Sequence, residues 1–535
     1  MKKLLSVVLA LLMLAVMLPV TAMAVEAPAG YTENGNSVSI SDEDSLKWFA
    51  QQVNTGNTYE GKTVTLTKDV TVSNWIPIGQ KGQKENENNR FKGTFDGNGN
   101  TVTIKGIGDL ENGFGGYAAF FGGTTGATIK NLTVDGTING ADVAGIVARA
   151  DGGLIENCHN KAAITGAKKA AGIAVINKAG TLIIRNCTNE GEIKSNGDRA
   201  GGIINLIQAA ATIENCINSG SVTSVATATY GAGGVVGWIA ADNYSIANCK
   251  NTAAVSGKGA AGGIVGGIGG IGTVSNCANT GAVTISAPAG KENEHNNIGG
   301  VAGYIKDSGL TATTNSNSGP LTGTCTRRYI AEDVTLSDSS YLQLIISKGA
   351  IVNITAGNLE NMVTNYGTLT VKTQVGASGA EGNNTQFHNY GNATISGTMA
   401  AGSIHSHEGA NTVFDGGNYH FTCITGMRNG LKFVAGTFND LRKDNGQTQW
   451  TDEEFMTYVA EDSTASKEGH VWTVTKNATP PDDGPSTIVI ITPTGDTPKT
   501  EPEKNPSTGA NDMVAAAAAL MAVSALGMAV LSRKK

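Results

Sequence analysis

Two short motifs recur along the middle of this chain with the same phase, and this repeat constrains the fold more than any other feature. The motif Asn-Cys-x-Asn returns in steps of 29, 29, 33 and 28 residues and begins at Asn157, Asn186, Asn215, Asn248 and Asn276. An apolar run introduced by Ala-Gly or Gly-Gly keeps step with it, at residues 144–148, 171–175, 201–205, 233–237, 262–266 and 299–303. Two motifs in phase indicate a repeated structural unit.

Each unit consists of three short runs rich in Ile and Val, for example residues 181–187, 191–195 and 201–207. The runs are too short and too often broken by glycine for helices, and Gly makes up 72 of the 535 residues. Repeats of this length without helices predict the coils of a parallel β-helix, stacked at about 4.8 Å. In such a stack Ile and Val form interior ladders and Asn amides hydrogen-bond from coil to coil. The Gly column fits a corner with positive φ or with close approach of the coils.

The repeat, written IxNCxNxGxVxG…GGIVG, resembles the GLUG-type repeats of bacterial surface β-helix proteins. Residues 64–104 resemble the lead-in coils of such repeats, so the resemblance covers roughly residues 35–320. It implies an all-β fold, a right-handed parallel β-helix, and the rule for parallel crossovers favours the same hand. GLUG-like repeats also accompany IgA-cleaving metallopeptidases, which need a His-Glu-x-x-His zinc motif. The nearest stretch, His407 to Asn411, lacks the second His, so that activity is not carried over.

A different repeat occupies the second half, where glycines stand at intervals of 18, 24 and 18 residues, at Gly349, Gly367, Gly391 and Gly409. We interpret it as a slimmer continuation of the β-helix. Because the end coils of a solenoid expose sheet edges, both ends need caps. Leu46, Phe49 and Val53 have the spacing of an amphipathic capping helix at one end. Thr451 and Glu454 form a capping box for a second short helix at the other.

Residues 1–24 have the three parts of a secretory signal peptide. Lys2 and Lys3 precede an apolar run from residue 4 to 20, and Ala22-Met23-Ala24 forms a small-x-small cleavage site. We expect a signal helix that is removed on export. An uncleaved anchor helix is the alternative, which the shortness of the apolar run disfavours.

Three segments follow one another at the other end of the chain. Residues 478–508 are rich in Pro, Thr, Asp and Lys and predict an extended spacer. The 19 apolar residues from Met513 to Leu531 are long enough for a transmembrane helix. Arg533, Lys534 and Lys535 then provide the basic residues typical of the cytoplasmic side.

The stretch Asn505, Pro506, Ser507, Thr508 and Gly509 stands just before that apolar run. Motif, apolar segment and basic tail in this order resemble the cell-wall sorting signal of Gram-positive bacteria, usually written LPXTG. The resemblance implies that a sortase cuts between Thr508 and Gly509 and joins the Thr508 carbonyl to an amine of peptidoglycan or its precursor. Asn505 replaces the usual Leu, which leaves the sortase class open. An ordinary C-terminal membrane anchor is the alternative.

The chain is therefore expected to have six parts: a signal peptide (1–24), a cap helix with the first strands (25–60), GLUG-like repeats (61–323), a second β-helix section with a C-terminal cap (324–477), a Pro/Thr-rich wall spacer (478–508), and the sorting signal with transmembrane helix and basic tail (509–535). Removal of both processed ends changes the net charge from −7 to −11, because two lysines leave with the first segment and a net charge of +2 leaves with the second. No basic block survives, which argues against nucleic-acid binding.

The repeated cysteines raise the question of a thiol or metal array. Thiolate metal sites usually contain two Cys that lie two to four residues apart, whereas each coil here contributes one. Adjacent coils place Cα atoms within disulfide range, so a bridge is allowed by distance. Because Leu132 occupies the same column in a degenerate first copy, we interpret these cysteines as small apolar core residues. His159 stands beside Cys158, but no other repeat has His there.

Acidic residues offer two further candidate sites. Residues 96–100, DGNGN, resemble the start of a calcium loop, but Thr101 and Ile107 occupy the places that need Gly and Glu, so a tight turn is expected. Glycoside hydrolysis needs two facing carboxylates. The acids of the repeat share one column with other residue types and are not a fixed pair: Glu156, Arg185, Glu214, Ala247 and Ser275.

A binding surface is the remaining candidate. Four residues after each column glycine come Arg149, Ile176, Leu206, Trp238, Gly267 and Tyr304. If this column faces outward, Trp238 and Tyr304 can stack on sugar rings; packing at a corner of the coil is the alternative. Two polar insertions, residues 81–90 and 287–297, lengthen a coil where solenoids often carry recognition sites.

The sequence therefore predicts a non-enzymatic protein on the outer surface of a Gram-positive cell wall, with a β-helix presented for adhesion or ligand binding. The expected partners are sortase and peptidoglycan, the membrane before sorting, and an extracellular glycan or host protein. No cofactor, metal or nucleic acid is expected. A surface polysaccharide lyase or glycoside hydrolase on this scaffold is the first alternative, and a wall spacer without a ligand is the second.

Overall fold

The computed structural model of the chain describes residues 26–478 except 80–88, 109–115, 226–230, 287–295, 307–308, 324–326, 338–342, 357, 360–361, 376–385, 399–401, 421, 427–428 and 444–447. The expected signal peptide, the sorting motif Asn505–Gly509 and the expected transmembrane helix lie outside the described residues. So do nearly all of the spacer and most of the two polar insertions. The chain divides into two units, Met1–Asn477 and Ala478–Lys535.

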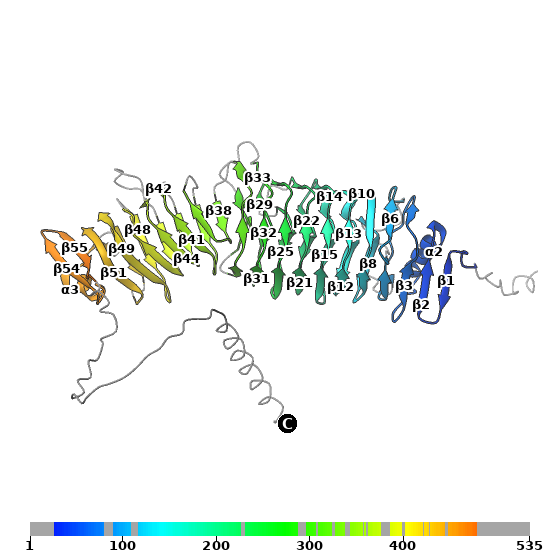
Figure 1. Cartoon of the computed structure of the whole chain (residues 1–535), viewed down its shortest axis with the longest axis horizontal. Helices are drawn as coiled ribbons and strands as arrows, with labels where there is room; N and C mark the ends of the chain where they lie inside the picture. Colours follow the sequence, from blue (N-terminus) through cyan, green and yellow to red (C-terminus); the bar gives the residue numbers. More distant parts are fainter. Residues whose placement is uncertain are drawn as a thin grey trace, which may run out of the picture. The chain divides into compact units, whose positions relative to one another are not determined.

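The described chain is mostly β-structure in sheets of parallel strands, as the repeat predicts, and Figure 1 shows the strands following one another in chain order. The largest regular sheet begins with the antiparallel pair β1 (Tyr31–Asn34) and β2 (Ser37–Ile40). It continues with parallel strands that follow one another along the chain: β3 (Thr63–Leu66), β5 (Thr94–Asp96), β9 (Thr128–Lys130), β12 (Gly153–Glu156), β16 (Leu182–Arg185), β21 (Ala211–Glu214), β26 (Tyr244–Ala247), β31 (Gly272–Ser275) and β35 (Leu310–Thr313).

A second sheet consists of the apolar runs that follow the column glycines: β8 (Phe121–Thr125), β11 (Val147–Asp151), β15 (Ala174–Asn177), β20 (Ile204–Ile207), β25 (Val236–Ile239) and β30 (Val265–Ile268). A third set begins with a ladder of two-residue strands at the second Asn of each motif: β13 (His159–Asn160), β17 (Thr188–Asn189), β22 (Ile217–Asn218), β27 (Lys250–Asn251), β32 (Ala278–Asn279) and β36 (Ser316–Asn317).

Two more ladders belong to the third set. In the first ladder, β4 (Val70–Val72), β6 (Thr101–Ile104) and the start of β10 (Thr133–Ala144) precede β13. One of the two further ladders contains the later part of β10, β14 (Ala163–Ala171), β18 (Ile193–Ser195), β23 (Val222–Ser224), β28 (Val255–Gly257), β33 (Val283–Ile285) and β37 (Leu321–Gly323). The other shares β10 and β14, and adds β7 (Tyr117–Ala118), β19 (Arg199–Gly201), β24 (Ala232–Gly233), β29 (Ala260–Gly262), β34 (Asn297–Gly299) and β38 (Arg327–Ile330).

The second half continues the last ladder with β40 (Gln343–Ile346), β43 (Met362–Asn365), β46 (Gln386–Asn389), β48 (Gly402–Ser406), β50 (Thr422–Gly426), β52 (Arg442–Lys443) and β53 (Thr448–Gln449). Its other sheet contains β39 (Val334–Leu336), β41 (Ile351–Ile354), β44 (Thr368–Val371), β47 (Asn392–Ile395), β49 (Asn411–His420), β51 (Leu431–Asn439), β55 (Val471–Lys476) and β54 (Ser463–Glu468). The pair β42 (Asn358–Leu359) and β45 (Gln374–Val375) completes it.

In-register ladders of branched apolar side chains build the core. One ladder runs through consecutive repeats, and every member is at most 2% exposed: Ile155, Ile184, Ile213, Ile246 and Val274. Burial of each such side chain stabilises the fold by about 1.5–3 kcal/mol. One apolar cluster extends from Val38 to Ala331 and a second from Ile330 to Val474, so each half of the repeat has a core of its own.

The two asparagines of each motif have separate tasks. The first of them, as in Asn215, adopts a left-handed backbone in all five copies, with φ between 49° and 55°. Asn tolerates this conformation better than most residues, and it turns the chain between two strands. The second Asn is buried and hydrogen-bonds the equivalent amide of the next repeat, as between Asn189 and Asn218. The predicted amide ladder is confirmed.

The column glycines serve close approach and not a positive φ, which corrects one of the two expectations for them. A Cβ atom at Gly202 would lie 2.0 Å from the carbonyl oxygen of Gly234 and 2.5 Å from the Asn218 side chain. None of the equivalent glycines has a positive φ. The neighbouring repeat and the buried amide ladder therefore occupy the space that a side chain would need.

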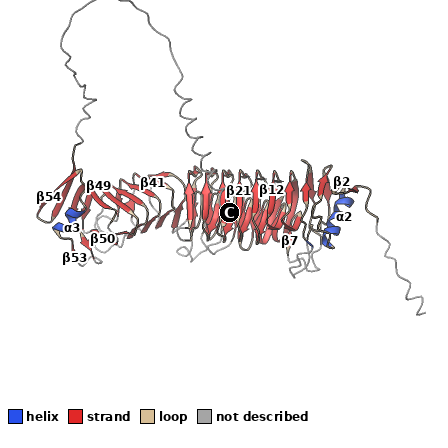
Figure 2. Ribbon diagram, turned by 90° about the horizontal axis from the view of Figure 1, so that it is seen from below, coloured by secondary structure: helices blue, strands red, loops and turns tan. Residues whose placement is uncertain are grey.

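Short helices lie near both ends of the described repeat (Figure 2). The helix α2 (Glu43–Asn54) buries Leu46, Phe49 and Val53, the side chains that the helical spacing predicts. The helix α3 (Asp452–Thr457) begins with the predicted capping box of Thr451 and Glu454. Neither helix in the described part of the chain has the length and apolar character needed to cross a membrane.

Candidate functional site

Trp238 and Tyr304, the predicted ligand surface, lie against one another. Their rings stack with centroids 5.8 Å apart and planes 20° apart. Gly267 stands between them in the column, because Trp238 pairs with Gly267 and Ile268 bridges to Ile305 one repeat later. Since Gly267 has no side chain, the two rings can meet across the intervening strand. Both rings are half-buried.

The other residues in the column of Trp238 and Tyr304 are too buried for this column to form one outward-facing surface. Arg149, Ile176, Leu206 and Trp238 are register partners in successive strands, as the repeat predicts. Ile176 and Leu206 are only 5% and 4% exposed, because they pack in a small apolar cluster beside the main core. The column therefore combines apolar packing in its middle with aromatic rings at one end. Tyr329 extends that end, since its ring meets Tyr304 edge to face at 5.6 Å.

A buried ionic cluster lies at the other end of this column and was not foreseen from the sequence. Asp151 at the end of β11 pairs with Arg90 and, at 2.8 Å, with Arg149. Burial alone would raise the pKa of the Asp151 carboxyl, but the hydrogen bond from Arg149 and the charges of both arginines outweigh it and lower the pKa. Arg90 and Asp151 lie 61 residues apart in sequence, so no local pattern connects them.

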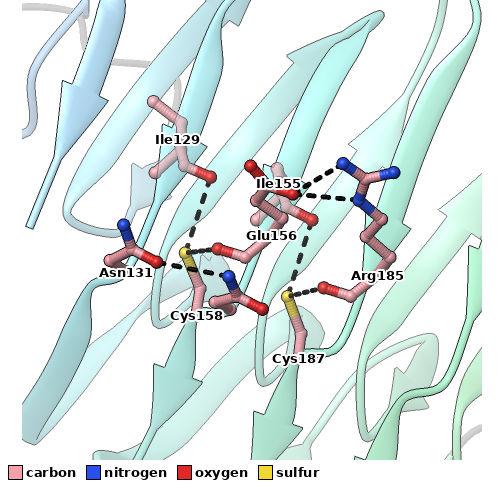
Figure 3. A network of polar contacts seen from close by, with 8 residues as sticks. Ile129, Asn131, Ile155, Glu156, Cys158, Arg185 and Cys187 are labelled. Atoms are coloured by element: carbon pink, nitrogen blue, oxygen red, sulfur yellow. Dashed lines mark hydrogen bonds and ion pairs between the residues drawn. The ribbon is translucent and has the colours of Figure 1, made fainter. Parts of the chain in front are cut away.

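The cysteine column consists of buried free thiols, and Figure 3 shows two of them, Cys158 and Cys187, with their polar contacts. Cys158 Sγ donates to the Glu156 carbonyl at 3.3 Å and lies 3.7 Å from the carbonyl oxygen of Ile129 in the preceding repeat. Cys187 repeats both contacts at 3.3 and 3.6 Å. Burial raises the pKa of the Cys187 thiol well above its ordinary value. A protonated thiol donates to a carbonyl, whereas a metal ligand must be a thiolate.

Metal coordination finds little support among the other candidates. His159 Nδ1 lies 2.7 Å from the hydroxyl of Thr188 in the next repeat. Within the described ranges no group of three or more His, Cys, Asp or Glu side chains could hold a metal ion. The DGNGN stretch is the expected turn, since Asn98 and Gly99 have φ of 52° and 79° and the Asp96 carboxylate accepts from the Asn98 backbone at 2.8 Å.

The column that contains Glu156 and Glu214 together with other residue types also has the predicted register. Glu156 pairs with Arg185, which pairs with Glu214, and Ala247 and Ser275 follow. The Glu156 carboxylate accepts a 2.8 Å hydrogen bond from the Arg185 guanidinium. This carboxylate therefore serves an ion pair between neighbouring strands.

Five aromatic rings form a connected series in the second half of the repeat region, which the sequence did not predict. Consecutive rings have centroids 4.8, 3.7, 5.6 and 4.8 Å apart along the series Tyr366, Tyr390, His407, His388 and His405. The repeated Asn-Tyr-Gly at residues 365–367 and 389–391 signals the first two rings, and His407 takes the same column one repeat later. Burial lowers the pKa of all three histidines, and the charge of a neighbouring histidine lowers that of His388 and His407 further.

Comparison with known proteins adds one distant neighbour. No family model and no curated protein matches the chain. A solved structure from Bacteroides ovatus, provisionally described as an immunoglobulin A1 protease, is similar over 58% of this chain and 76% of its own, at 15% identity and a TM-score of 0.33. At that TM-score the likeness decides neither the fold nor the activity of this chain.

Proposed function

We propose that this chain is a non-enzymatic surface protein anchored in the cell wall of a Gram-positive bacterium. The observation that carries the proposal is the order of the C-terminal segments: the motif Asn505–Gly509, the apolar run and the basic tail. In this proposal a signal peptide exports the chain, and the apolar run holds it in the membrane until a sortase acts. Thr508 then becomes the residue joined to peptidoglycan.

The fold that we propose for the exported part is a right-handed parallel β-helix. One turn would consist of β12, β13, β14 and β15, after which β16 returns to the sheet of β12 as its parallel neighbour. The hand follows from the strong preference for right-handed parallel crossovers. An experimental structure with left-handed winding, or with β16 paired elsewhere, would contradict this proposal.

The role that we propose for the repeat is binding of an extracellular glycan or host protein at Trp238 and Tyr304. The two stacked, half-buried rings support this role, because aromatic side chains offer a large apolar contact with a polar edge. The Pro/Thr-rich segment 478–508 would hold this surface away from the wall.

Anchoring is tested by Thr508→Ala in the full chain, with Ser507→Ala, at the variable position of the motif, as the matched control. Cell walls are boiled in detergent and digested with a muramidase, and the released protein is analysed by mass spectrometry. We expect the Ser507→Ala chain to carry peptidoglycan fragments and the Thr508→Ala chain to leave the wall fraction. Thr508→Ala protein that remains covalently bound would overturn the anchoring proposal.

Ligand binding is tested by applying purified residues 25–477 to an array of glycans and host matrix proteins. Trp238→Ala and Tyr304→Ala should each weaken a positive signal, whereas Tyr366→Ala, in another aromatic stack, should not. Release of reducing ends or unsaturated sugars from an arrayed polysaccharide would support the lyase or hydrolase alternative. An array without any signal would support the spacer alternative.

A further inference from the structure

Two exposed cations lie next to the aromatic group that contains Tyr304 and Tyr329. Lys306 and Tyr304 stand on either side of Ile305, which packs in the core, so both side chains leave the outer face of the same segment. Arg327, which is exposed, precedes Tyr329 by two residues in β38 and shares its face in the same way. The guanidinium of Arg327 lies close enough to the Tyr329 hydroxyl to oppose the rise that burial causes in the pKa of that hydroxyl. Two successive segments therefore each place one cation beside one ring.

Trp238 reaches toward Lys306 from two repeats earlier. Gly269 stands beside Lys306, because the residues that precede them, Ile268 and Ile305, form a β-bridge. A Cβ atom at Gly269 would lie 3.2 Å from Cζ2 of the indole. The indole therefore extends to the strand beside Lys306, so this lysine belongs to the same surface as both rings of the proposed ligand site.

The edges of these rings add to the positive potential of the two cations. An aromatic ring is negative over its face and positive along its edge. Trp238 and Tyr304 cover part of one another's faces, because they stack with planes 20° apart. Such a stack offers a ligand mainly its edges and the tyrosine hydroxyl. The ring edges and the cations therefore both favour a negatively charged ligand.

Neither cation has an acidic partner in the part of the chain that the structure describes. The ion pairs of that part include neither Lys306 nor Arg327. Arg185 on another face of the repeat is paired, by contrast, with Glu156. An anionic ligand at Lys306 and Arg327 therefore does not have to displace an internal carboxylate.

We propose that this face binds an acidic glycan, a saccharide that carries carboxylate or sulfate groups. Lys306 and Arg327 hold the anionic groups, and the aromatic edges contact the sugar rings. A guanidinium suits this task, because it binds planar anions through paired N–H donors. The inference rests on the role proposed above for Trp238 and Tyr304 and names the class of their ligand.

An acidic peptide in extended conformation suits this face less well. The strand β25, which carries Trp238, is paired on both sides, with β20 and with β30. The strand β38, which carries Tyr329, is likewise paired with β34 and with β40. Neither strand has a free edge for the main-chain hydrogen bonds that hold an added peptide strand. Side-chain donors remain, and they suit the oxygen-rich surface of a glycan.

The test is affinity electrophoresis of the full chain in gels that contain heparin, polygalacturonate or dextran, which are sulfated, carboxylated and neutral polysaccharides. Lys306→Gln and Arg327→Gln should each raise the dissociation constant for at least one acidic polysaccharide about tenfold, the loss expected for one charge-assisted hydrogen bond. Lys194→Gln removes the same charge from an exposed position in β18 and is the matched control, which should bind as the unaltered chain does. Added NaCl should weaken binding of the acidic polysaccharides.

A measurement on the unaltered chain keeps the inference open to refutation if a variant fails to fold. The acidic polysaccharide that binds should protect Lys306, but not Lys194, from acetylation by acetic anhydride. Binding of neither acidic polysaccharide, equal dissociation constants for the Arg327→Gln and Lys194→Gln chains, or equal acetylation of Lys306 with and without ligand would overturn the inference. The proposed function fails separately, because a neutral glycan bound through Trp238 would preserve it. Binding of acidic host proteins alone would overturn the inference and assign this face to a protein partner.

Discussion

The side-chain amide of Asn189 donates a 2.7 Å hydrogen bond to the amide oxygen of Asn218 one repeat further on, and both side chains are fully buried. The same nitrogen of Asn189 donates a second hydrogen bond, of 2.9 Å, to the Gly191 carbonyl. Identical links continue along the column from Asn160 to Asn317. The amide column therefore joins neighbouring repeats inside the fold, where an unpaired polar group would be costly.

Asn218→Ala should destabilise the fold markedly. It removes the donor to the Asn251 amide oxygen and the acceptor for Asn189, and an unsatisfied buried group costs about 1–3 kcal/mol. The measurement is the midpoint of urea unfolding followed by circular dichroism. Thr212→Ala, at a half-exposed position of the same repeat, should shift the midpoint much less. Equal shifts for the two variants would show that the amide column carries no special stability.

The phase of the motifs made this column predictable, whereas isolated contacts were not. A strict period places Asn189 over Asn218, and Trp238 near Tyr304, without knowledge of any side-chain rotamer. The period does not show that Asp151 meets Arg90, because the arginine belongs to a polar insertion that has no equivalent in other repeats. It also could not separate the two explanations for the column glycines, since both a positive φ and a close contact select glycine.

The ring stack around His407 illustrates a second limit. The glycine intervals of 18 and 24 residues in this half blur the register, and the order of the rings depends on side-chain torsions. His388 and His407 belong to different columns, yet their nitrogens lie within 3.2 Å. Sequence spacing identifies residues of one column, but contacts between columns need the structure.

Asn215 provides a test of backbone conformation separate from hydrogen bonding. Its φ is 54°, a conformation that glycine adopts freely and that β-branched residues strongly resist. Asn215→Gly should leave the unfolding midpoint nearly unchanged, while Asn215→Val should destabilise the fold by about 1–3 kcal/mol. Both variants remove the same side-chain amide, so each is the control for the other. A similar loss in both would assign the role of Asn215 to its side chain and not to its turn.

The buried thiols should make stability fall in alkaline solution. The pKa of Cys187 and Cys216 is raised in the folded chain, by burial for Cys187 and by the neighbouring Cys187 thiol for Cys216. A raised pKa contributes stability that is fully present below the pKa of the unfolded thiol, about 8.5, and is lost as the pH rises further. The double variant Cys187→Ala/Cys216→Ala should therefore lose less stability between pH 8 and pH 10 than the unaltered chain.

A core variant without a titrating group serves as the control for that experiment. Val222→Ala also leaves a cavity in the repeat, because Val222 is fully buried, but it removes no thiol. Its urea midpoint should be lower at every pH, with the same dependence on pH as in the unaltered chain. If the double cysteine variant kept that dependence too, ionisation of the column would not be the cause.

Asp151 offers the corresponding test in acid. Its carboxylate is the shared partner of the buried Arg90 and the half-buried Arg149, and Asp151→Asn would remove the negative charge from both ion pairs. Loss of one partner from a buried ion pair costs about 3–5 kcal/mol, so the urea midpoint at pH 7 should fall strongly. Asp462→Asn removes the partner of an exposed ion pair with Lys476, which is worth about 0–1 kcal/mol, and is the matched control.

Because the folded pKa of Asp151 is lowered, its contribution to stability is present above the unfolded value of about 3.9 and is lost as the pH falls through the folded value. The Asp151→Asn chain should accordingly lose less of its remaining stability than the unaltered chain when the pH is lowered from 5 to 2. Parallel losses in the two chains over that range would mean that the two arginines do not hold the carboxylate in its charged form.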